Sequence, residues 1–439
     1  AAVEMRADAG GEAFGNITFV DSAGIDFATS AGSNGDFYIN ASTDGLVGGN
    51  LSVTATTGDI TDTVALQTTG SSTASFTTSA DDATITLDAP TLTGAVSLNT
   101  SGSSGHATLD NGTTALNIGT SDIDGNLTLT AGDDITDSGV LTVGGTSSFT
   151  ADVNDKLITL DQNHALTGAI SITTTDNETT VNNDADVTIS GMNSGLELKL
   201  GTLTIKGDLS ITTASTVGIS DEGVLTIHGT SSFVTSTDDA TIDLGSTNFF
   251  NGEIDLSTRG TSGHVTLVQG DSTGLKFAAS EVRGNLTATT GSGSAVSQSG
   301  ILTVDGTTDI STEDAGGDGD HDSNVKLETQ ENVLTGAVSL RGWNVRLVNS
   351  KAVELGTVKS RALIVTARDA ITQSLASVIT SKGSSTIKAQ SSDTNIDYDI
   401  TLENASNDIQ GNIILTAANV SIKNTGSTLL GASTLSGNY

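Results

Sequence analysis

The chain has 439 residues, 52 acidic and 17 basic side chains, a formal net charge of −35, one Pro and no Cys. A chain this acidic is repelled by nucleic acids and anionic membranes, which excludes both as general partners. The absence of Cys excludes disulfides and thiol catalysis, and no apolar run reaches the length of a membrane-spanning helix.

Residues 1–48 carry short strand-like pieces at 16–20 and 37–39, and we expect them to form lead-in coils. The first residues, AAVEMRADAGG, lack a basic region followed by an apolar core. We therefore expect that a signal peptide has been removed or that the chain is a piece of a longer protein.

A repeat begins at residue 49, and its best-preserved copy reads GNLTLTAGDDITDSGVLTVGGTSSFTADV. The copies open at Gly49, Gly125, Gly207, Gly284 and Arg361, so the period is about 80 residues. Residues 49–360 thus hold four repeats, and residues 361–439 hold a degenerate fifth. Self-similarity at such a period is typical of repeat architectures.

Within the copy that opens at Gly125, strand-like pieces recur about every 20 residues, at 127–130, 148–150, 170–173 and 187–189. Each piece alternates apolar residues with Thr or Ser, as a strand buried on one face does. A coil of this length buries its apolar face only by stacking on the next coil. The pattern predicts an all-β parallel β-helix with about 20 residues per coil and four coils per repeat. The residues expected to point inward include Leu127, Leu129, Phe149, Ile170, Ile172, Leu209 and Ile211.

An array of immunoglobulin-like β-sandwiches with the same period is the alternative. Such modules usually place a Trp or Tyr in each core, whereas aromatic residues make up 3% of this chain and Trp343 is its one Trp. The composition therefore favours the β-helix.

A second, longer period lies above the first. The sequence SADDATITL at 79–87 matches STDDATIDL at 236–244, and SGSSGHATL at 101–109 matches RGTSGHVTL at 259–267. Both matches are shifted by about two repeat lengths, which indicates the duplication of a two-repeat block.

The repeats GNLTLTAGDDITDSGVLTVGGTSSFTA, followed by TGAISI or TGAVSL, resemble those of filamentous haemagglutinin-like and related β-strand-repeat adhesins, which are very large bacterial exoproteins. The resemblance covers about residues 49–437 and implies a surface-exposed or released rod that serves attachment, matrix or filament formation. The secretion domain of that family, with its Asn-Pro-Asn motifs, has no counterpart here, so the resemblance assigns no site residues.

Paired carboxylates at 81–82, 133–134 and 238–239 are the residues that most suggest catalysis, because polysaccharide enzymes also use β-helices. Each pair precedes a strand, where Asp is favoured for local turn hydrogen bonds, so we expect turn residues instead. The five His residues show no zinc-binding spacing. We expect no catalytic residue and no enzyme activity.

One segment interrupts the repeat with EDAGGDGDHDSNV between Thr312 and Lys326. Its alternating carboxylates have the spacing with which successive oxygens wrap a hard cation. Asp318, Asp320 and Asp322 are therefore candidate calcium ligands, and calcium is the one candidate cofactor. The alternative interpretation is a solvated acidic loop.

Basic residues gather near the C-terminus, where residues 326–439 hold ten of the 17 Lys and Arg with nine acids. Arg341, Arg361 and Lys382 recur at the predicted coil length of about 20 residues, so stacked coils would align them into a ladder. Stacked like charges repel, which calls either for interleaved acids and solvent or for an acidic partner. The candidate interaction residues are Arg341, Arg346, Arg361 and Lys382.

These features predict a non-enzymatic structural or adhesive rod at a bacterial surface or outside the cell, where the lack of Cys is common. The alternative is a polysaccharide-binding or polysaccharide-active β-helix protein, for which Trp343 beside Arg341 and Arg346 is the one aromatic and basic cluster. The expected partners are a surface receptor, a polysaccharide, or another copy of the chain. Because neither end shows an evident cap, copies are expected to pair end to end unless flanking coils cover the ends.

Overall fold

The computed structural model describes residues 16–27, 37–39, 49–63, 66–68, 70–176, 184–270, 273–312, 321, 323–393 and 396–437. These residues form strands and turns, and no helix occurs among them. The described residues therefore include no helix long and apolar enough to cross a membrane. The contacts divide the chain into unit 1, residues 1–215 with 227–229, and unit 2, residues 216–226 with 230–439.

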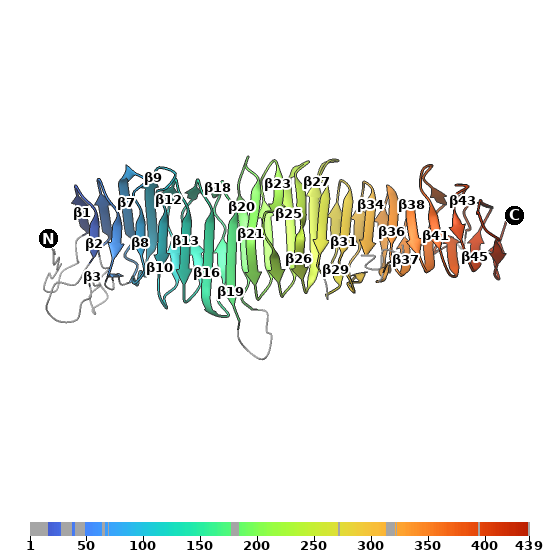
Figure 1. The fold of residues 1–439 in the computed structure, drawn as a ribbon, viewed down its shortest axis with the longest axis horizontal. Coiled ribbons are helices and arrows are strands. Elements are labelled where there is room, and N and C mark those ends of the chain that lie inside the picture. The colour runs from blue at the N-terminus through green and yellow to red at the C-terminus, as the bar shows by residue number, and fades with distance from the viewer. Residues whose placement is uncertain are drawn as a thin grey trace. The chain divides into compact units, whose positions relative to one another are not determined.

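The strands of unit 1 form two main sheets, called A and B here, and one small pair (Figure 1). Sheet A contains β1 (Ile17–Asp21), β4 (Leu51–Ala55), β7 (Ala74–Asp81), β9 (Ala95–Ser101), β11 (Leu116–Ile118), β12 (Ser121–Ile123), β14 (Ile135–Asp137), β15 (Leu141–Val143), β17 (Ile158–Leu160), β18 (Ala165–Leu166), β20 (Val187–Met192) and β22 (Leu209–Thr213). Sheet B contains β2 (Ile25–Phe27), β5 (Ile60–Asp62), β8 (Ile85–Leu87), β10 (Ala107–Asp110), β13 (Leu127–Ala131), β16 (Ser147–Asn154), β19 (Ile170–Thr175) and β21 (Leu198–Ile205). The small pair is β3 (Phe37–Ile39) with β6 (Leu66–Thr68).

Unit 2 is built from the same two kinds of sheet. Its sheet A contains β25 (Ser231–Asp238), β27 (Glu253–Arg259), β29 (Leu275–Phe277), β30 (Ser280–Val282), β32 (Val296–Gln298), β33 (Leu302–Val304), β35 (Val325–Leu334), β37 (Asn344–Asn349), β39 (Ala362–Ala367), β42 (Ser385–Ala389), β45 (Asn412–Ala417), β47 (Leu429–Leu430) and β48 (Thr434–Leu435). Its sheet B contains β23 (Gly218–Asp221), β24 (Leu225–Ile227, of which Ile227 is assigned to unit 1), β26 (Thr241–Phe250), β28 (Val265–Gln269), β31 (Leu286–Thr290), β34 (Thr308–Thr312), β36 (Ala337–Arg341), β38 (Val353–Ser360), β40 (Ile371–Gln373), β41 (Ile379–Ser381), β43 (Ile400–Leu402), β44 (Asp408–Ile409) and β46 (Val420–Ile422).

Neighbouring strands in each sheet are parallel and come from successive turns of the chain. In unit 1, Leu51 pairs with Ala74, and Ala74 pairs in turn with Val96. In unit 2, Val265 pairs with Leu286 in the same way. Each unit is therefore a parallel β-solenoid with about 22 residues per turn, which confirms the predicted fold class.

The number of turns per repeat differs from the predicted four. Leu51, in the second position after the repeat start, lies in sheet A, whereas the equivalent Leu127 lies in sheet B and Leu209 lies in sheet A again. In unit 2 the equivalent Leu286 and Leu363 likewise lie in sheets B and A. A repeat therefore makes three and a half turns, and successive copies present the same sequence on opposite sheets.

This half turn explains the longer period, which spans two repeats. In unit 1 the path from Leu51 to Leu209 completes seven whole turns and returns to the same sheet. A given segment of the repeat therefore returns to the same sheet only after two repeats. The duplicated block is thus the smallest unit that restores both the sequence and its place in the coil.

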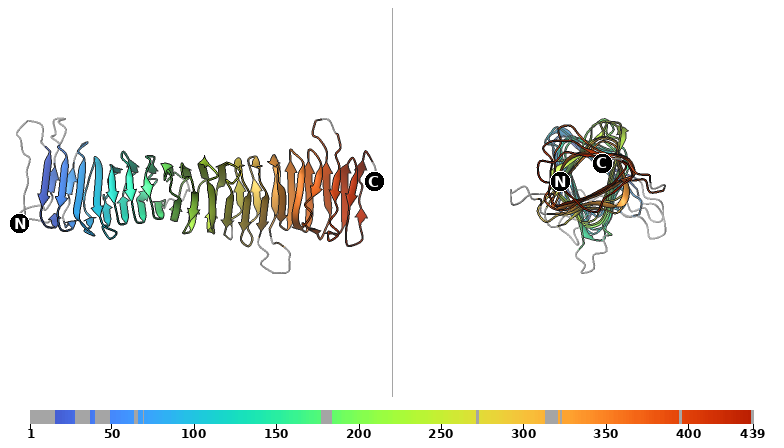
Figure 2. Two further views of the ribbon diagram at one scale, coloured as in Figure 1. Left: turned by 90° about the horizontal axis from the view of Figure 1, so that it is seen from above. Right: turned by 90° about the vertical axis from the view of Figure 1, so that its right-hand side faces the viewer.

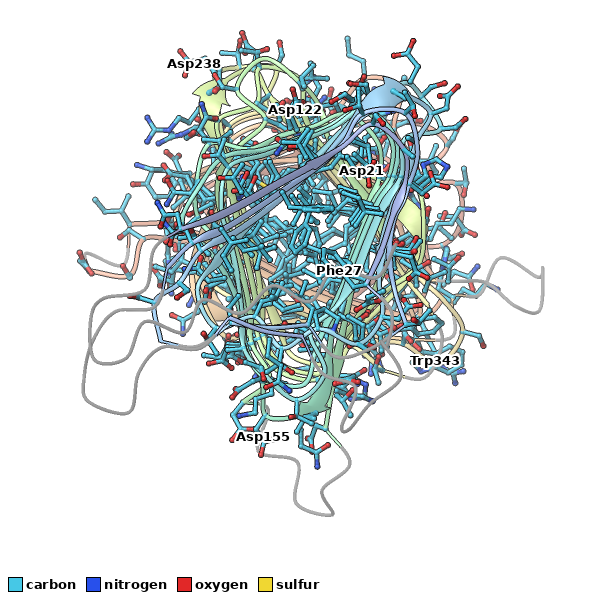
Figure 3. The ribbon with its side chains drawn as sticks, turned by 90° about the vertical axis from the view of Figure 1, so that its left-hand side faces the viewer. Asp21, Phe27, Asp122, Asp155, Asp238 and Trp343 are labelled. Atoms are coloured by element: carbon cyan, nitrogen blue, oxygen red, sulfur yellow. The ribbon has the colours of Figure 1, made fainter. Side chains whose placement is uncertain are left out.

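The core consists of alternate strand residues that point inward from both sheets. β13 and β16 show the expected alternation of buried and solvent-facing positions. The seven residues predicted to point inward are all buried, with at most 1% of their surface exposed. In end view the coils of unit 2 enclose one interior (Figure 2), and Figure 3 shows Phe27 of unit 1 projecting inward. Stacking of whole turns is therefore what buries the apolar face.

Glycine opens the repeat because two turns come into direct contact at this corner. The amide of Gly125 donates to the carbonyl of Gly105, and the amide of Gly145 donates to the carbonyl of Gly125. A Cβ on Gly145 would lie 2.7 Å from the Gly125 oxygen and 2.2 Å from Oδ1 of Asn126. No side chain fits this space without shifting the backbone.

The Asn that follows this glycine links one turn to the next. The amide of Asn126 donates to Nδ1 of His106 at 2.9 Å, and Oδ1 of Asn126 accepts from the amide of Thr146 at 3.0 Å. In unit 2, His264 and Asn285 repeat the first contact at 2.9 Å. These side chains satisfy backbone groups at the corner, where the strand ladder is interrupted.

Candidate functional site

The paired carboxylates brace turns, as predicted. Asp82 and Asp239 have positive φ angles of 62° and 63°, and each accepts a hydrogen bond from the backbone of the next turn. Asp133 lies 2.9 Å from Nζ of Lys156, whose hydrogen bond lowers the pKa of that carboxyl. One carboxylate of each pair, Asp82, Asp133 or Asp239, is thus engaged in a turn contact.

A buried His–Asp pair lies in unit 1, where Nε2 of His164 is 3.0 Å from Oδ2 of Asp137. Nδ1 of His164 accepts from the amide of Leu141 at 2.9 Å, so the proton of the neutral ring resides on Nε2. Burial opposes ionisation of Asp137, but the hydrogen bond from His164 and two backbone amides outweigh it and lower the pKa of the carboxyl. The pair is closed to substrate, since both side chains are at most 1% exposed.

In unit 2, pairs of amide side chains occupy the place that His164 and Asp137 occupy in unit 1, and they show what the His–Asp pair does. Asn332 accepts from the amide of Leu302 at 3.0 Å and exchanges two 2.9 Å hydrogen bonds with Gln298. Asn407 and Gln373 repeat this arrangement. In each case a side chain from the next turn satisfies the first amide of a short strand that follows a kink. The His–Asp pair is therefore structural.

The candidate calcium ligands Asp318, Asp320 and Asp322 lie outside the described residues, so their interpretation stays a prediction. Among the described residues, no group of three or more His, Asp or Glu side chains is arranged to hold a metal ion. Asn324, at the end of the acidic segment, accepts hydrogen bonds from the backbone and the side chain of Asn344.

The candidate basic residues of unit 2 divide into two groups. Arg341 forms an ion pair with Asp309, and Arg346 lies 3.1 Å from Glu328. The candidate Arg361 belongs to the second group, together with Lys359, which was not predicted; none of the ion pairs in the described part of the chain involves either of the two. Acidic side chains of the same unit thus neutralise Arg341 and Arg346, which was the alternative to binding of an acidic partner. The second group forms the candidate site.

The ladder has a different register from the predicted one. Arg341 pairs with Lys359, and Lys359 pairs with Thr380. Arg346 does stack on Lys326, 20 residues before it, as the predicted coil length requires. The turn between β36 and β38 is shorter than the predicted coil, so Arg361 falls next to Trp343 instead of Arg341. Fixed spacing failed here because turn length varies along the solenoid.

A hollow on unit 2 brings the second group together with the chain's one Trp. It is lined by His321, Gly342, Trp343, Lys359, Ser360, Arg361, Thr380 and Lys382. Trp343, Lys359, Arg361 and Lys382 are exposed, and they come from three successive turns. Figure 3 shows Trp343 at the outer surface. We call these eight residues the basic–aromatic hollow.

Trp343 and Arg361 form the centre of the basic–aromatic hollow. The guanidinium carbon of Arg361 lies 4.7 Å from the centroid of the indole ring, within the range of a cation–π contact. The amide of Arg361 also donates to the carbonyl of Trp343 at 2.8 Å, which fixes the two residues one above the other. The ring holds the guanidinium in place, while 36% of the Trp343 surface remains exposed.

Two buried polar residues complete the hollow. Nδ1 of His321 lies 2.5 Å from the carbonyl of Thr312, and because a carbonyl only accepts, Nδ1 carries the hydrogen. The hydroxyl of Ser360, a residue 8% exposed, has no hydrogen-bond partner in the described part of the chain.

Sequence reasoning missed Lys359, Ser360 and His321. The signal for Lys359 was its place two positions before Arg361, on the same strand face as that residue. No pattern pointed to Ser360 or His321, since both join the hollow only through the register of the turns.

In a comparison with known families, the chain matches the model of DUF5649, described as repeats of unknown function. Its model matches residues 104–173, 182–257, 262–341 and 342–416, and these copies open about 80 residues apart, in agreement with the repeat length found here. No curated protein and no solved structure is similar enough to count as a match. The four matched ranges cover well over half of the sequence, and the chain belongs to the DUF5649 repeat family.

Proposed function

We propose that the chain is a non-enzymatic structural or adhesive solenoid of the bacterial exterior. The turns of each unit use their inward residues for the core and their corner residues for bracing one another. The surface outside these contacts is left to solvent and partners. A stacked scaffold of this kind offers a long surface for binding at little cost to its core.

The observation that carries the proposal is the composition of the basic–aromatic hollow. It combines an exposed Trp with exposed cations on a chain whose net charge is −35. Among the described residues that line it there is no Asp or Glu. Glycoside hydrolysis needs two carboxyl groups flanking the bond, so this lining suits binding better than hydrolysis.

The location is tested on the cells that produce the protein. Intact cells are treated with a protease and with an antibody to unit 2, and the culture medium is assayed in parallel. We expect labelling and protease sensitivity without lysis, or release into the medium. Protein found only after lysis would contradict an exterior role.

The absence of catalysis is tested with purified protein and a panel of neutral and acidic polysaccharides. We expect neither new reducing ends nor the ultraviolet absorbance of unsaturated sugars. A polysaccharide-active protein is the alternative, favoured by His321 beside Lys359 and Arg361. Turnover that disappears in a His321→Ala variant would establish that alternative.

End-to-end association of copies stays a prediction. Among the described residues, β47 and β48 pair only with β45, and Leu429 and Leu430 are 59% and 41% exposed. Unpaired backbone at such an edge pairs readily with another strand. We expect the mass of the purified chain, measured by light scattering, to rise with concentration. A constant monomer mass would rule out association through this edge.

A further inference from the structure

We propose that the basic–aromatic hollow of unit 2 binds a carboxylate-bearing sugar of an acidic polysaccharide. This proposal deepens the adhesive role proposed above by naming the ligand class of one site. It rests on two observations: the arginine that contacts an exposed Trp ring, and the column of cations on successive turns.

Arg361 supplies the anion contact. A guanidinium presents two parallel N–H donors that match the two oxygens of a carboxylate. Contact with Trp343 at 4.7 Å fixes the direction of this fork before a ligand arrives. Preorganisation lowers the entropy that binding must overcome, because the long side chain is already ordered.

Lys359 and Lys382 extend the positive charge along the coil. The amide of Lys382 donates to the carbonyl of Ser360, so the two residues lie on adjacent turns, and Lys359 precedes Ser360 on its strand. Adjacent parallel strands lie about 4.8 Å apart. A ligand with repeated negative charges therefore meets a cation on more than one turn when it lies along the stack.

Trp343 favours a sugar over a bare anion or an acidic peptide. The face of an indole ring carries partial negative charge, which attracts the polarised C–H groups of a pyranose ring. Trp343 is the one Trp of the chain, and 36% of its surface is exposed beside the cations. Cations alone would bind any polyanion. The adjacent indole ring favours a ligand whose carboxylate is attached to a sugar ring, because the C–H groups of that ring can pack on the indole.

The position of Trp343 makes the experiment site-specific, because all tryptophan emission of the chain arises in the hollow. The full chain is titrated with an oligogalacturonate, with its fully methyl-esterified counterpart, and with poly-glutamate of matched charge. Calorimetry measures the same affinities without the tryptophan signal. We expect saturable binding of the oligogalacturonate, and binding about tenfold weaker for both other probes, which lack either the charge or the ring.

The variants are Arg361→Ala with Lys382→Ala, Lys359→Ala, and Trp343→Ala. Each is expected to weaken oligogalacturonate binding about tenfold or more, since the double change removes two charge-assisted contacts and each single change removes one charge-assisted or ring contact. Lys388→Ala is the matched control, because Lys388 lies on β42 of the same unit and outside the hollow. It should keep the wild-type affinity. Circular dichroism and the melting temperature show that each variant is folded.

Four results would each overturn the proposal. They are equal binding of the methyl ester, equal binding of poly-glutamate, equal weakening by Lys388→Ala, and no saturable binding of the oligogalacturonate. Equal binding of poly-glutamate would assign the hollow to an acidic protein partner. None of these results bears on where the protein resides or on whether it turns over polysaccharide, so the proposed function is tested separately.

Discussion

At the scale of single residues, the solenoid is specified by side chains that satisfy backbone groups at the kinks between short strands. His164 and Asp137 occupy in unit 1 the place that Asn332 and Gln298 occupy in unit 2. Both pairs supply an acceptor to the first amide of a short strand. The chemistry of the pair changes between the copies, but the hydrogen-bond requirement that it meets stays the same.

This equivalence predicts that the pairs are interchangeable. His164→Ala should lower the free energy of unfolding by about 3 kcal/mol, because it leaves the Leu141 amide and the Asp137 carboxylate buried without this partner. The double change Asp137→Gln with His164→Asn should keep most of the stability, since it recreates the Gln298–Asn332 arrangement. Urea unfolding of the three proteins measures both effects. A double variant as unstable as His164→Ala would contradict the shared role.

His228 predicts a pH dependence of unit 1. Burial lowers the pKa of His228, and so does Lys206, whose Nζ lies 3.3 Å from Nε2 of the ring. Because the pKa of His228 is lower in the folded chain, the unfolded chain takes up the proton first as the pH falls. The contribution of neutral His228 to the free energy of unfolding is therefore complete above pH 6.5 and is lost as the pH falls below that value. We expect the urea midpoint to decline between pH 6.5 and 5, and to decline less in Lys206→Gln and in His228→Asn. Parallel curves for the three proteins would exclude His228 as the cause.

At the scale of the strand and the turn, stability depends on how closely successive turns approach. The Gly105, Gly125 and Gly145 corners stack with amide-to-carbonyl distances of 3.1 and 2.9 Å. The core behind them is closed by residues such as Ile172, which has no exposed surface. Corner and core act together, since a shift at one corner displaces the turn on which the next one stacks.

Two substitutions test this arrangement. Gly145→Ala should destabilise the fold by several kcal/mol, because its Cβ would lie 2.2 Å from Oδ1 of Asn126 and 2.7 Å from the Gly125 oxygen. Ile172→Ala should cost about 2–4 kcal/mol through the cavity it leaves. Gly426→Ala is the control, since its Cβ would meet only Oδ1 of Asp408, at 3.9 Å. If Gly145→Ala and Gly426→Ala had the same melting temperature, the close contact between the turns at Gly145 would be contradicted.

The sequence predicts the strands and the inward residues well, because alternation of apolar and hydroxyl residues is a local signal. It does not predict which sheet a strand joins. Val187 follows the strand at 170–173 in the sequence and has the same alternation, yet it belongs to sheet A, while Ile170 pairs with Leu200 in sheet B. Both sheets show period 2, so the spacing of strands cannot separate four turns from three and a half.

The candidate site was predictable only in part, for a related reason. Trp343 and Arg361 stand out by composition, but the register that joins them depends on the short step between β36 and β38. The preceding step in the same sheet, from Ser311 to Arg341, is longer, since it includes the acidic segment that follows Thr312. Long-range neighbours in a solenoid are set by the sum of irregular turns, so one unexpected turn length changes every later contact.

At the scale of the whole molecule, the dominant property is a net charge of −35. Burial raises the pKa of Asp62 and of Asp186, and the neighbouring carboxylates of Asp88 and Asp208 raise them further. A raised pKa means that these carboxyls favour the folded state below pH 3.8 and that this advantage is lost as the pH rises through their folded values. At neutral pH the stacked acids therefore repel across the turns.

This repulsion predicts that salt stabilises the protein at pH 7, and it supplies the baseline against which calcium binding is judged. Sodium chloride should raise the melting temperature by screening the stacked acids, over a Debye length of about 8 Å at physiological ionic strength. Millimolar calcium, at an ionic strength held constant with sodium chloride, should raise it further if Asp318, Asp320 and Asp322 hold the ion. The triple change of these residues to Asn removes three charges and three ligands, so it should abolish the calcium increment and leave the sodium chloride effect in place. An equal calcium increment in the triple variant would assign the whole effect to screening of the acidic turns, and the segment would then be a solvated loop.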